Sequence, residues 1–131
     1  MPKTDLNLTE SAERFAQSRI EVGELQVLSA SDELFNHVDD DLPMWSGVGD
    51  RNIDLTIKFV RAFKSRPHII LSITGLDAAH DQNLRYWLTA SNIDRFQFTM
   101  NFSTWHDTHL ARVGVSWQAV GPRRVMPLDH L

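Results

Sequence analysis

Residues 96–102, with the sequence FQFTMNF, decide the fold of this chain. Phe96, Phe98, Met100 and Phe102 occupy every second position, and polar residues occupy the positions between them. Side chains on a β-strand point alternately to the two faces of the sheet, so this period of two predicts a strand with one buried face and one polar face. No other stretch gives so strong a strand signal.

The same alternation recurs on both sides of this stretch. Further strands are expected at 20–28 (around Gly23), 53–59, 68–73, 84–90 and 113–119. The run at 68–73 is apolar throughout and is expected to be well buried, whereas turn residues at 39–43, 46–50 and 75–81 predict loops. Six strands separated by turns about every ten residues predict an all-β fold, a six-stranded antiparallel β-sandwich.

One helix is expected, at residues 8–19 near the N-terminus. Thr9 or Ser11 can cap it, and Leu8, Ala12 and Phe15 fall on one side. The chain is therefore divided into an N-terminal extension (1–19), a β-sandwich domain (20–121) and a C-terminal tail (122–131). A helix this short needs a packing partner, which leaves its own domain or a neighbouring subunit open.

Composition excludes several classes of function. The 131 residues include 13 basic and 17 acidic residues, a net charge of −4, which gives no attraction to phosphate backbones. The chain has no cysteine, and neither a signal peptide nor a membrane-spanning segment is recognisable. We therefore expect no nucleic-acid partner and no membrane insertion. We expect synthesis in the cytoplasm, followed by release or by display on a particle or cell surface.

Four short motifs point to a known family. They are ILSITGLD (70–77), QNLR (82–85), TWHDT (104–108) and VSW (115–117), and in this order and spacing they resemble the H-type lectins over roughly residues 53–120. The resemblance implies a six-stranded sandwich assembled as a homotrimer that binds galactose-type sugars, above all N-acetylgalactosamine. It implies no enzymatic activity, no cofactor and no metal.

The resemblance also implies which residues contact the sugar. Arg85 matches the arginine that binds sugar hydroxyls, and Trp105 and His106 match the aromatic pair beside the ring. The acidic partner comes from an earlier loop, where Asp50 is the nearest candidate and Gly47 a backbone neighbour. The sequence departs from the family pattern at Ala111, where the snail agglutinin has a tyrosine that closes the site from the adjacent subunit.

The chemistry of these residues suits a sugar, which presents fixed hydroxyls and a C–H-rich face. Trp105 supplies an amphipathic ring, Arg85 a rigid set of donors and Asp50 a charged acceptor. On composition alone, a tryptophan that caps the core is the more common interpretation of Trp105, and Arg85 could be a solvated strand residue. His106 and His109 with Asp107 between them are weak evidence for zinc, so the loop is interpreted as solvated.

Two functions are compatible with these observations. The chain is either a multivalent sugar-binding module that serves as an attachment component, or a structural trimeric adaptor of a larger assembly whose sugar site has degenerated. Surface residues such as Trp87 or Val113 are candidates for burial at the threefold axis. An enzyme is disfavoured because neither a nucleophile motif nor a phosphate-binding loop is present.

Overall fold

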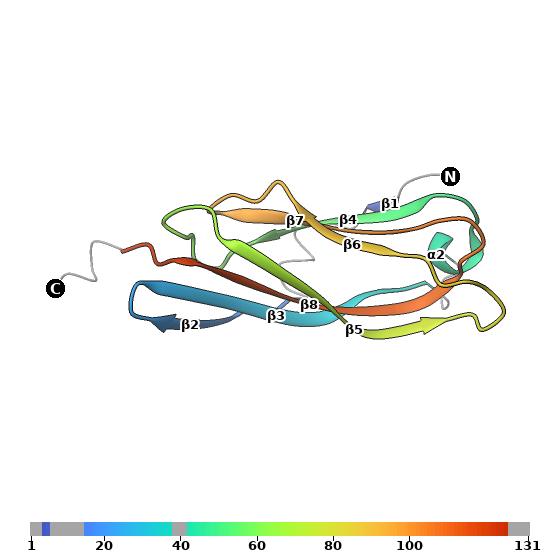
Figure 1. Ribbon diagram of the computed structural model, residues 1–131, viewed down its shortest axis with the longest axis horizontal. Helices are drawn as coiled ribbons and strands as arrows, with labels where there is room; N and C mark the ends of the chain where they lie inside the picture. Colours follow the sequence, from blue (N-terminus) through green and yellow to red (C-terminus); the bar gives the residue numbers. More distant parts are fainter. Residues whose placement is uncertain (1–3, 6–14, 38–41, 126–131) are drawn as a thin grey trace.

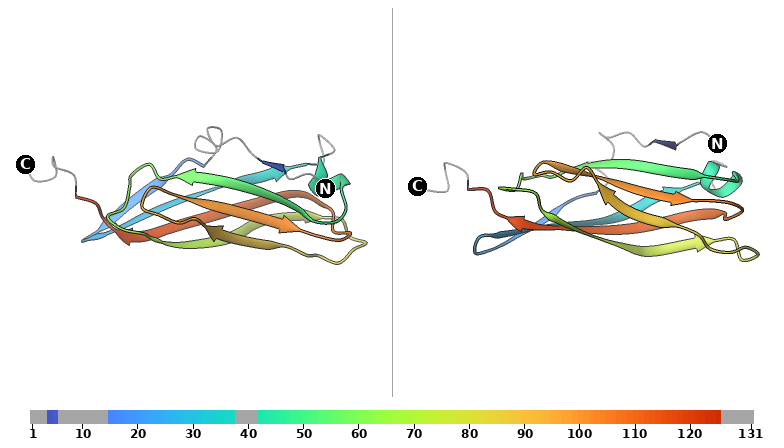
Figure 2. Two further views of the ribbon diagram at one scale, coloured as in Figure 1. Left: turned by 90° about the horizontal axis from the view of Figure 1, so that it is seen from above. Right: turned by 45° about the horizontal axis from the view of Figure 1, so that its top comes forward.

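A computed structural model describes residues 4–5, 15–37 and 42–125 of the chain. Two β-sheets pack face to face as an elongated sandwich (Figure 1), and the two layers are seen from other sides in Figure 2. The elements are β1 (Thr4–Asp5), β2 (Ser18–Val22), β3 (Leu25–Asn36), α2 (Pro43–Ser46), β4 (Arg51–Lys58), β5 (His68–Ala78), β6 (Trp87–Ser91), β7 (Gln97–Thr104) and β8 (Leu110–Pro122).

Each sheet has four strands. The first has the order β1-β4-β7-β6 and the second the order β2-β3-β8-β5. Every pair is antiparallel except β1 with β4. The all-β antiparallel sandwich expected from the alternation is thus confirmed. The count exceeds six because Gly23, with φ of 60°, turns the expected strand at 20–28 into the β2–β3 hairpin, and because β1 adds a short parallel pair.

The residues that alternate in the sequence form the core between the sheets. Trp117 is fully buried at its centre, with ring centroids 5.4 Å from Phe98 and 6.1 Å from Phe59. The other members from β4, β7 and β8 are Ile53, Leu55, Ile57, Met100, Phe102, Val113, Val115 and Ala119. A contiguous apolar interior of this size is the main source of stability for a domain without disulfides.

Four expectations about particular segments are wrong. Phe96 precedes β7 and is 54% exposed instead of facing the core. Val113 is fully buried inside its own chain and cannot line a threefold axis. The strand at 68–73 is the edge strand β5, which continues through Gly75 to Ala78 and leaves Ile70 43% exposed.

The fourth concerns the helix expected at residues 8–19. Residues 8–14 lie outside the described part of the chain. Ser18 and Arg19 belong to β2, so the helix does not extend to Arg19 as expected. The described helix is the single turn α2, in a segment where only loops were expected. The proposed division into residues 1–19, 20–121 and 122–131 stays a prediction.

The segments that carry the candidate site lie at one end of the sandwich. Helix α2 and the loops after β5 and β7 lie together there, and the β2–β3 hairpin lies at the opposite end (Figures 1 and 2). Functional residues are commonly carried on such loops because a rigid β-scaffold fixes the ends of each loop.

Candidate functional site

Asp50, Trp105 and Arg85 lie next to the ends of three strands, at the same end of the first sheet. Asp50 precedes β4, Trp105 follows β7, and Arg85 lies two residues before β6. Because β7 pairs with both β4 and β6, these positions are neighbours across three adjacent strands. Asp50 and Trp105 line one shallow depression of about 340 Å³. Arg85 was expected on a strand, and the structure instead places it in the segment leading into one.

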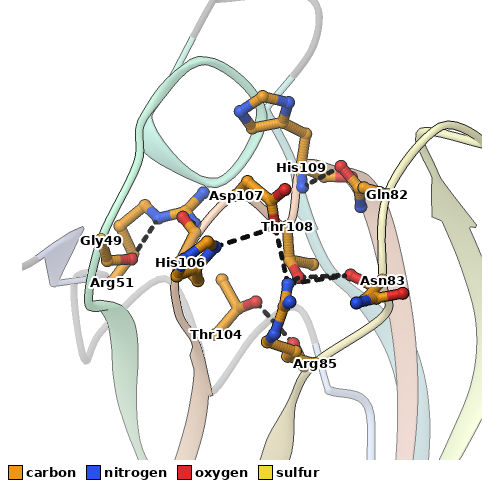
Figure 3. Close-up of polar contacts among 10 residues, drawn as sticks. All are labelled: Gly49, Arg51, Gln82, Asn83, Arg85, Thr104, His106, Asp107, Thr108 and His109. Carbon is orange, nitrogen blue, oxygen red and sulfur yellow. Dashed lines mark hydrogen bonds and ion pairs between the residues drawn. The ribbon is translucent and has the colours of Figure 1, made fainter.

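The Arg85 side chain contacts the loop that carries Trp105. Its Nη1 donates to Asp107 Oδ1 at 2.6 Å, to Thr108 Oγ1 at 3.1 Å and to the Asn83 carbonyl at 3.4 Å (Figure 3). Within the described part of the chain, Nε and Nη2 donate to no protein acceptor, although the side chain is only 22% exposed. A held guanidinium with unused donors is suited to bind hydroxyl oxygens.

His106 stands at the tip of this loop. It has a φ of 62°, a left-handed conformation that histidine adopts more readily than bulky or branched residues, and its side chain is 71% exposed. Its Nδ1 lies 3.1 Å from Asp107 Oδ1. Hydrogen bonds from His106 and Arg85 lower the pKa of Asp107, which keeps this carboxylate charged. The Nε2 of His106 is directed away from that bond and is available to a ligand.

Short hydrogen bonds fix both backbones on either side of Arg85. Thr108 Oγ1 donates to the Asn83 carbonyl at 2.6 Å, and Thr104 Oγ1 donates to the Arg85 carbonyl at 2.5 Å. Gln82 binds the His109 backbone twice, accepting from its N–H at 2.6 Å and donating to its carbonyl at 3.1 Å. Arg85 is therefore presented by a rigid loop pair (Figure 3).

Arg51 is a further functional residue that the sequence analysis missed. It is 2% exposed and donates to the carbonyls of Gly49 (Nε, 2.9 Å), Pro43 (Nη1, 3.2 Å), Met44 (Nη1, 3.4 Å) and His106 (Nη2, 3.1 Å). Burial lowers the pKa of Arg51, and the nearby Asp50 opposes that shift. The guanidinium thus ties the loop before β4 to the loop after β7. The sequence indicated the burial of Arg51 only through its spacing, because Arg51 lies two residues before Ile53, in the same alternating series as the inward-facing apolar residues of β4.

The early loop meets His106 through Gly49. Gly49 has a φ of 78°, which favours glycine, and its N–H donates to the His106 carbonyl at 2.9 Å. Gly47 follows the last residue of α2, and its N–H donates to the Pro43 carbonyl at the start of that helix. Gly47 makes no hydrogen bond to residues 105–109 in the described structure. Ala111, the position of the family's closing tyrosine, is 4% exposed in β8 and forms no wall.

Two other site types receive no support from the described residues. Across 15–37 and 42–125, no group of three or more histidines and acidic residues is placed to hold a metal ion. No helix in these ranges is long and apolar enough to cross a bilayer.

A known protein family matches part of this chain. The H-type lectin domain matches residues 54–120, which is just over half of the chain. The chain belongs to the H-type lectin domain family. Of the residues at the site, Arg85, Trp105 and His106 lie within the matched segment, and Asp50 and Arg51 precede it.

The chain is also similar to a curated protein in sequence and to solved structures in fold. A protein of Fuscovulum blasticum, described as ATP synthase subunits region ORF 7, is 35% identical over 91 residues, which cover 70% of this chain and 79% of that protein. Recombinant discoidin II of Dictyostelium discoideum has a TM-score of 0.65 at 22% identity over 78% of this chain, and the wild-type discoidin II structure has 0.66 at 22% over 77%. The matches cover 39% and 38% of those chains, so the chain spans about two fifths of discoidin II. The fold is that of a carbohydrate-binding lectin.

Proposed function

We propose that this chain binds a galactose-type sugar, such as N-acetylgalactosamine, at the surface formed by Asp50, Arg85, Trp105 and His106, and that it catalyses no reaction. The observation that carries the proposal is the placement of Arg85. Its guanidinium is anchored through Nη1 on the loop that follows Trp105, and its other donors are unused within the described chain.

The chemistry of the surrounding groups supports the same ligand. Trp105 is half-buried at the edge of the depression that it shares with Asp50, so its ring can pack against the C–H face of a pyranose. Asp50 is exposed and can accept hydrogen bonds from two hydroxyls. Such sites exchange water for protein at a small net gain, so one site is expected to bind with a Kd of roughly 0.1–1 mM.

Weak single sites favour a multivalent molecule, and we propose a homotrimer formed through the second sheet. On its outward face one row of paired residues crosses all four strands: Ile20, Val27, Val120 and His68. Ile20 is 59% exposed, and Val22, Leu25 and Ile70 beside this row are 65%, 49% and 43% exposed. The residues of this row and its neighbours are neutral or apolar, which suits contact with further copies of the same face. Linked sites can raise avidity by roughly 10²–10⁴, which would serve attachment to a glycan-bearing surface.

The sugar site is tested by calorimetric titration with N-acetylgalactosamine after a glycan-array screen. Wild-type protein should bind, whereas Arg85→Ala and Trp105→Ala should each lose at least tenfold in affinity while remaining folded. Arg112→Ala is the matched control, because Arg112 is an exposed arginine that pairs with Glu33 on the other sheet. Equal affinity in all four proteins would refute the assignment.

The trimer is tested separately by sedimentation equilibrium. A charge placed in the apolar row, Ile20→Asp, should shift the mass from three chains to one without reducing affinity for the free monosaccharide. A wild-type monomer at micromolar concentration would refute the trimer.

A structural adaptor is the second candidate function. The observation that favours it is Ala111, which is buried in its own chain at the position where the snail agglutinin has a tyrosine that closes the site. A folded trimer that binds no sugar on a broad array would support the adaptor and refute the lectin function.

A further inference from the structure

The outward face of the first sheet is polar, and among the nine outward residues named below only Asp54 is charged. Alternate residues of β4, β7 and β6 point to this face because their neighbours are buried in the core. In order away from the loops they are Asn52, Asp54 and Thr56 on β4, Ser103, Asn101 and Thr99 on β7, and Trp87, Thr89 and Ser91 on β6. Amides and hydroxyls in such rows are the groups that bind sugar hydroxyls.

The depression at Trp105 continues along this face. Besides Asp50 and Trp105, its lining includes Asn52, Ser103 and Asn101, which follow one another down β4 and β7. The surface suited to a sugar therefore extends beyond the residues placed around Arg85, and it leads away from the loops over the sheet.

An exposed tryptophan borders this extension. Trp87 is 65% exposed, the most of the four tryptophans, and it pairs directly with Ser103. Trp105 lies two residues beyond Ser103, just after the end of β7, so both tryptophans border the same end of this face. We expect a glycan of two sugars to be long enough to contact both indoles.

Polar atoms between the two rings are unused. The side chains of Asn52 and Ser103 make no hydrogen bond to any described residue. Asn101 Nδ2 donates to Asp54 Oδ1, and Asn101 Oδ1 accepts no hydrogen bond from a described residue. Thr56 and Thr99 are already joined at 3.3 Å, so the free groups are concentrated next to Trp87 and Trp105.

We propose that this face is an extended subsite, so that the ligand is a glycan of at least two sugars and not a single terminal sugar. The terminal sugar occupies the place beside Arg85 and Trp105. The next sugar lies over Asn52 and Ser103 with its apolar face against Trp87. This inference rests on the proposed sugar-binding function and adds the length and direction of the bound glycan.

The test compares ligand lengths in calorimetric titrations of the full chain. The probes are N-acetylgalactosamine and the disaccharides and trisaccharides that carry it at the non-reducing end. Wild-type protein should bind the best longer glycan about 5- to 10-fold more tightly than the monosaccharide, a difference of roughly 1–1.4 kcal/mol. Trp87→Ala should abolish this gain and leave monosaccharide affinity unchanged, and Trp87→Phe should retain part of it.

Phe96→Ala is the matched control, because Phe96 is also a largely exposed aromatic residue (54%), at the far end of the same sheet. It should leave both affinities unchanged. Equal affinity of the wild type for all ligand lengths, no effect of Trp87→Ala, or a loss of oligomeric mass in Trp87→Ala would each overturn the extended subsite while sugar binding stands. Absence of binding to every probe, in the wild type, would overturn the proposed function and the subsite together.

Discussion

Replacing Arg51 with methionine tests whether one buried guanidinium organises the site. Methionine keeps much of the volume and the unbranched shape, so the substitution removes hydrogen bonds without opening a large cavity. The substitution leaves two of the four carbonyls that Arg51 contacts with another hydrogen-bond donor and two without one in the described chain. The Pro43 carbonyl still accepts from Gly47, and the His106 carbonyl still accepts from Gly49, each at 2.8–2.9 Å.

The carbonyls of Gly49 and Met44 have no other donor within the described chain, and they would be left unsatisfied. An unsatisfied buried polar group costs about 1–3 kcal/mol, so two of them predict a loss of roughly 2–6 kcal/mol in the free energy of unfolding. The Gly49 carbonyl is only partly buried, which favours the lower values. Relief from burying a charge partly offsets this loss and favours the lower half of the range. A domain of this size has about 5–15 kcal/mol to lose, so the variant should still fold.

The assay is urea unfolding at pH 7, with the free energy and the m-value fitted together. Arg112→Met is the control, because it removes only a surface ion pair with Glu33 and should cost less than about 1 kcal/mol. The Arg51 variant should also bind sugar more weakly, since the loop before β4 and the loop at His106 are no longer joined. A cost below about 1 kcal/mol, equal to that of the control, would refute the assignment of Arg51 as the organising residue.

Three further perturbations follow from the geometry. The pKa of Asp107 is lowered in the folded state, so its charge stabilises the protein at pH values above the ordinary aspartate pKa of about 3.9. This contribution is lost as the pH falls through the folded-state pKa. Asp107→Asn should therefore show a smaller drop in melting temperature between pH 5 and pH 2 than the wild type. Gly121→Ala places a Cβ 3.0 Å from Pro67 and should cost about 1–3 kcal/mol by thermal unfolding, whereas Gly114→Ala meets only a rotatable hydroxyl and should cost less. Thr108→Val removes the bond to the Asn83 carbonyl from a fully buried side chain, and denaturant unfolding should show a loss of about 1–3 kcal/mol.

Most of the fold could be predicted from the sequence because the core strands are buried on one face and solvated on the other. That environment imposes a period of two, as at Ile53, Leu55 and Ile57, which the structure places at 0–1% exposure. For the edge strand β5, the prediction of a well-buried strand was wrong. Its apolar run is typical of a buried strand, but alternate residues such as Ile70 point to the outward face of the sheet, and the strand has a neighbour on one side only.

The candidate site was harder to predict because its residues come from three strand ends that are distant in the sequence. The resemblance supplied Arg85, Trp105 and His106, and the pairing of β7 with β4 and β6 explains why they lie together. Arg51 could not be recognised in the same way. An arginine at an inward position looks like the end of a strand until the carbonyls that satisfy it are known, and those belong to loops whose paths the sequence does not define.

The two faces of the sandwich constrain each other's roles. If the neutral, apolar row around Ile20 is covered by other copies around a threefold axis, the opposite face with Trp87 must point outward in every copy, because the two sheets lie back to back. The trimer and the extended subsite therefore predict opposite effects for substitutions of the exposed residues Ile20 and Trp87. Ile20→Asp should change mass and avidity for a multivalent surface but not affinity for a soluble glycan, whereas Trp87→Ala should change affinity for a soluble oligosaccharide but not mass. Any variant that changes both would mean that sugar and neighbouring chain meet on one face, and the separation of roles between the two sheets would be wrong.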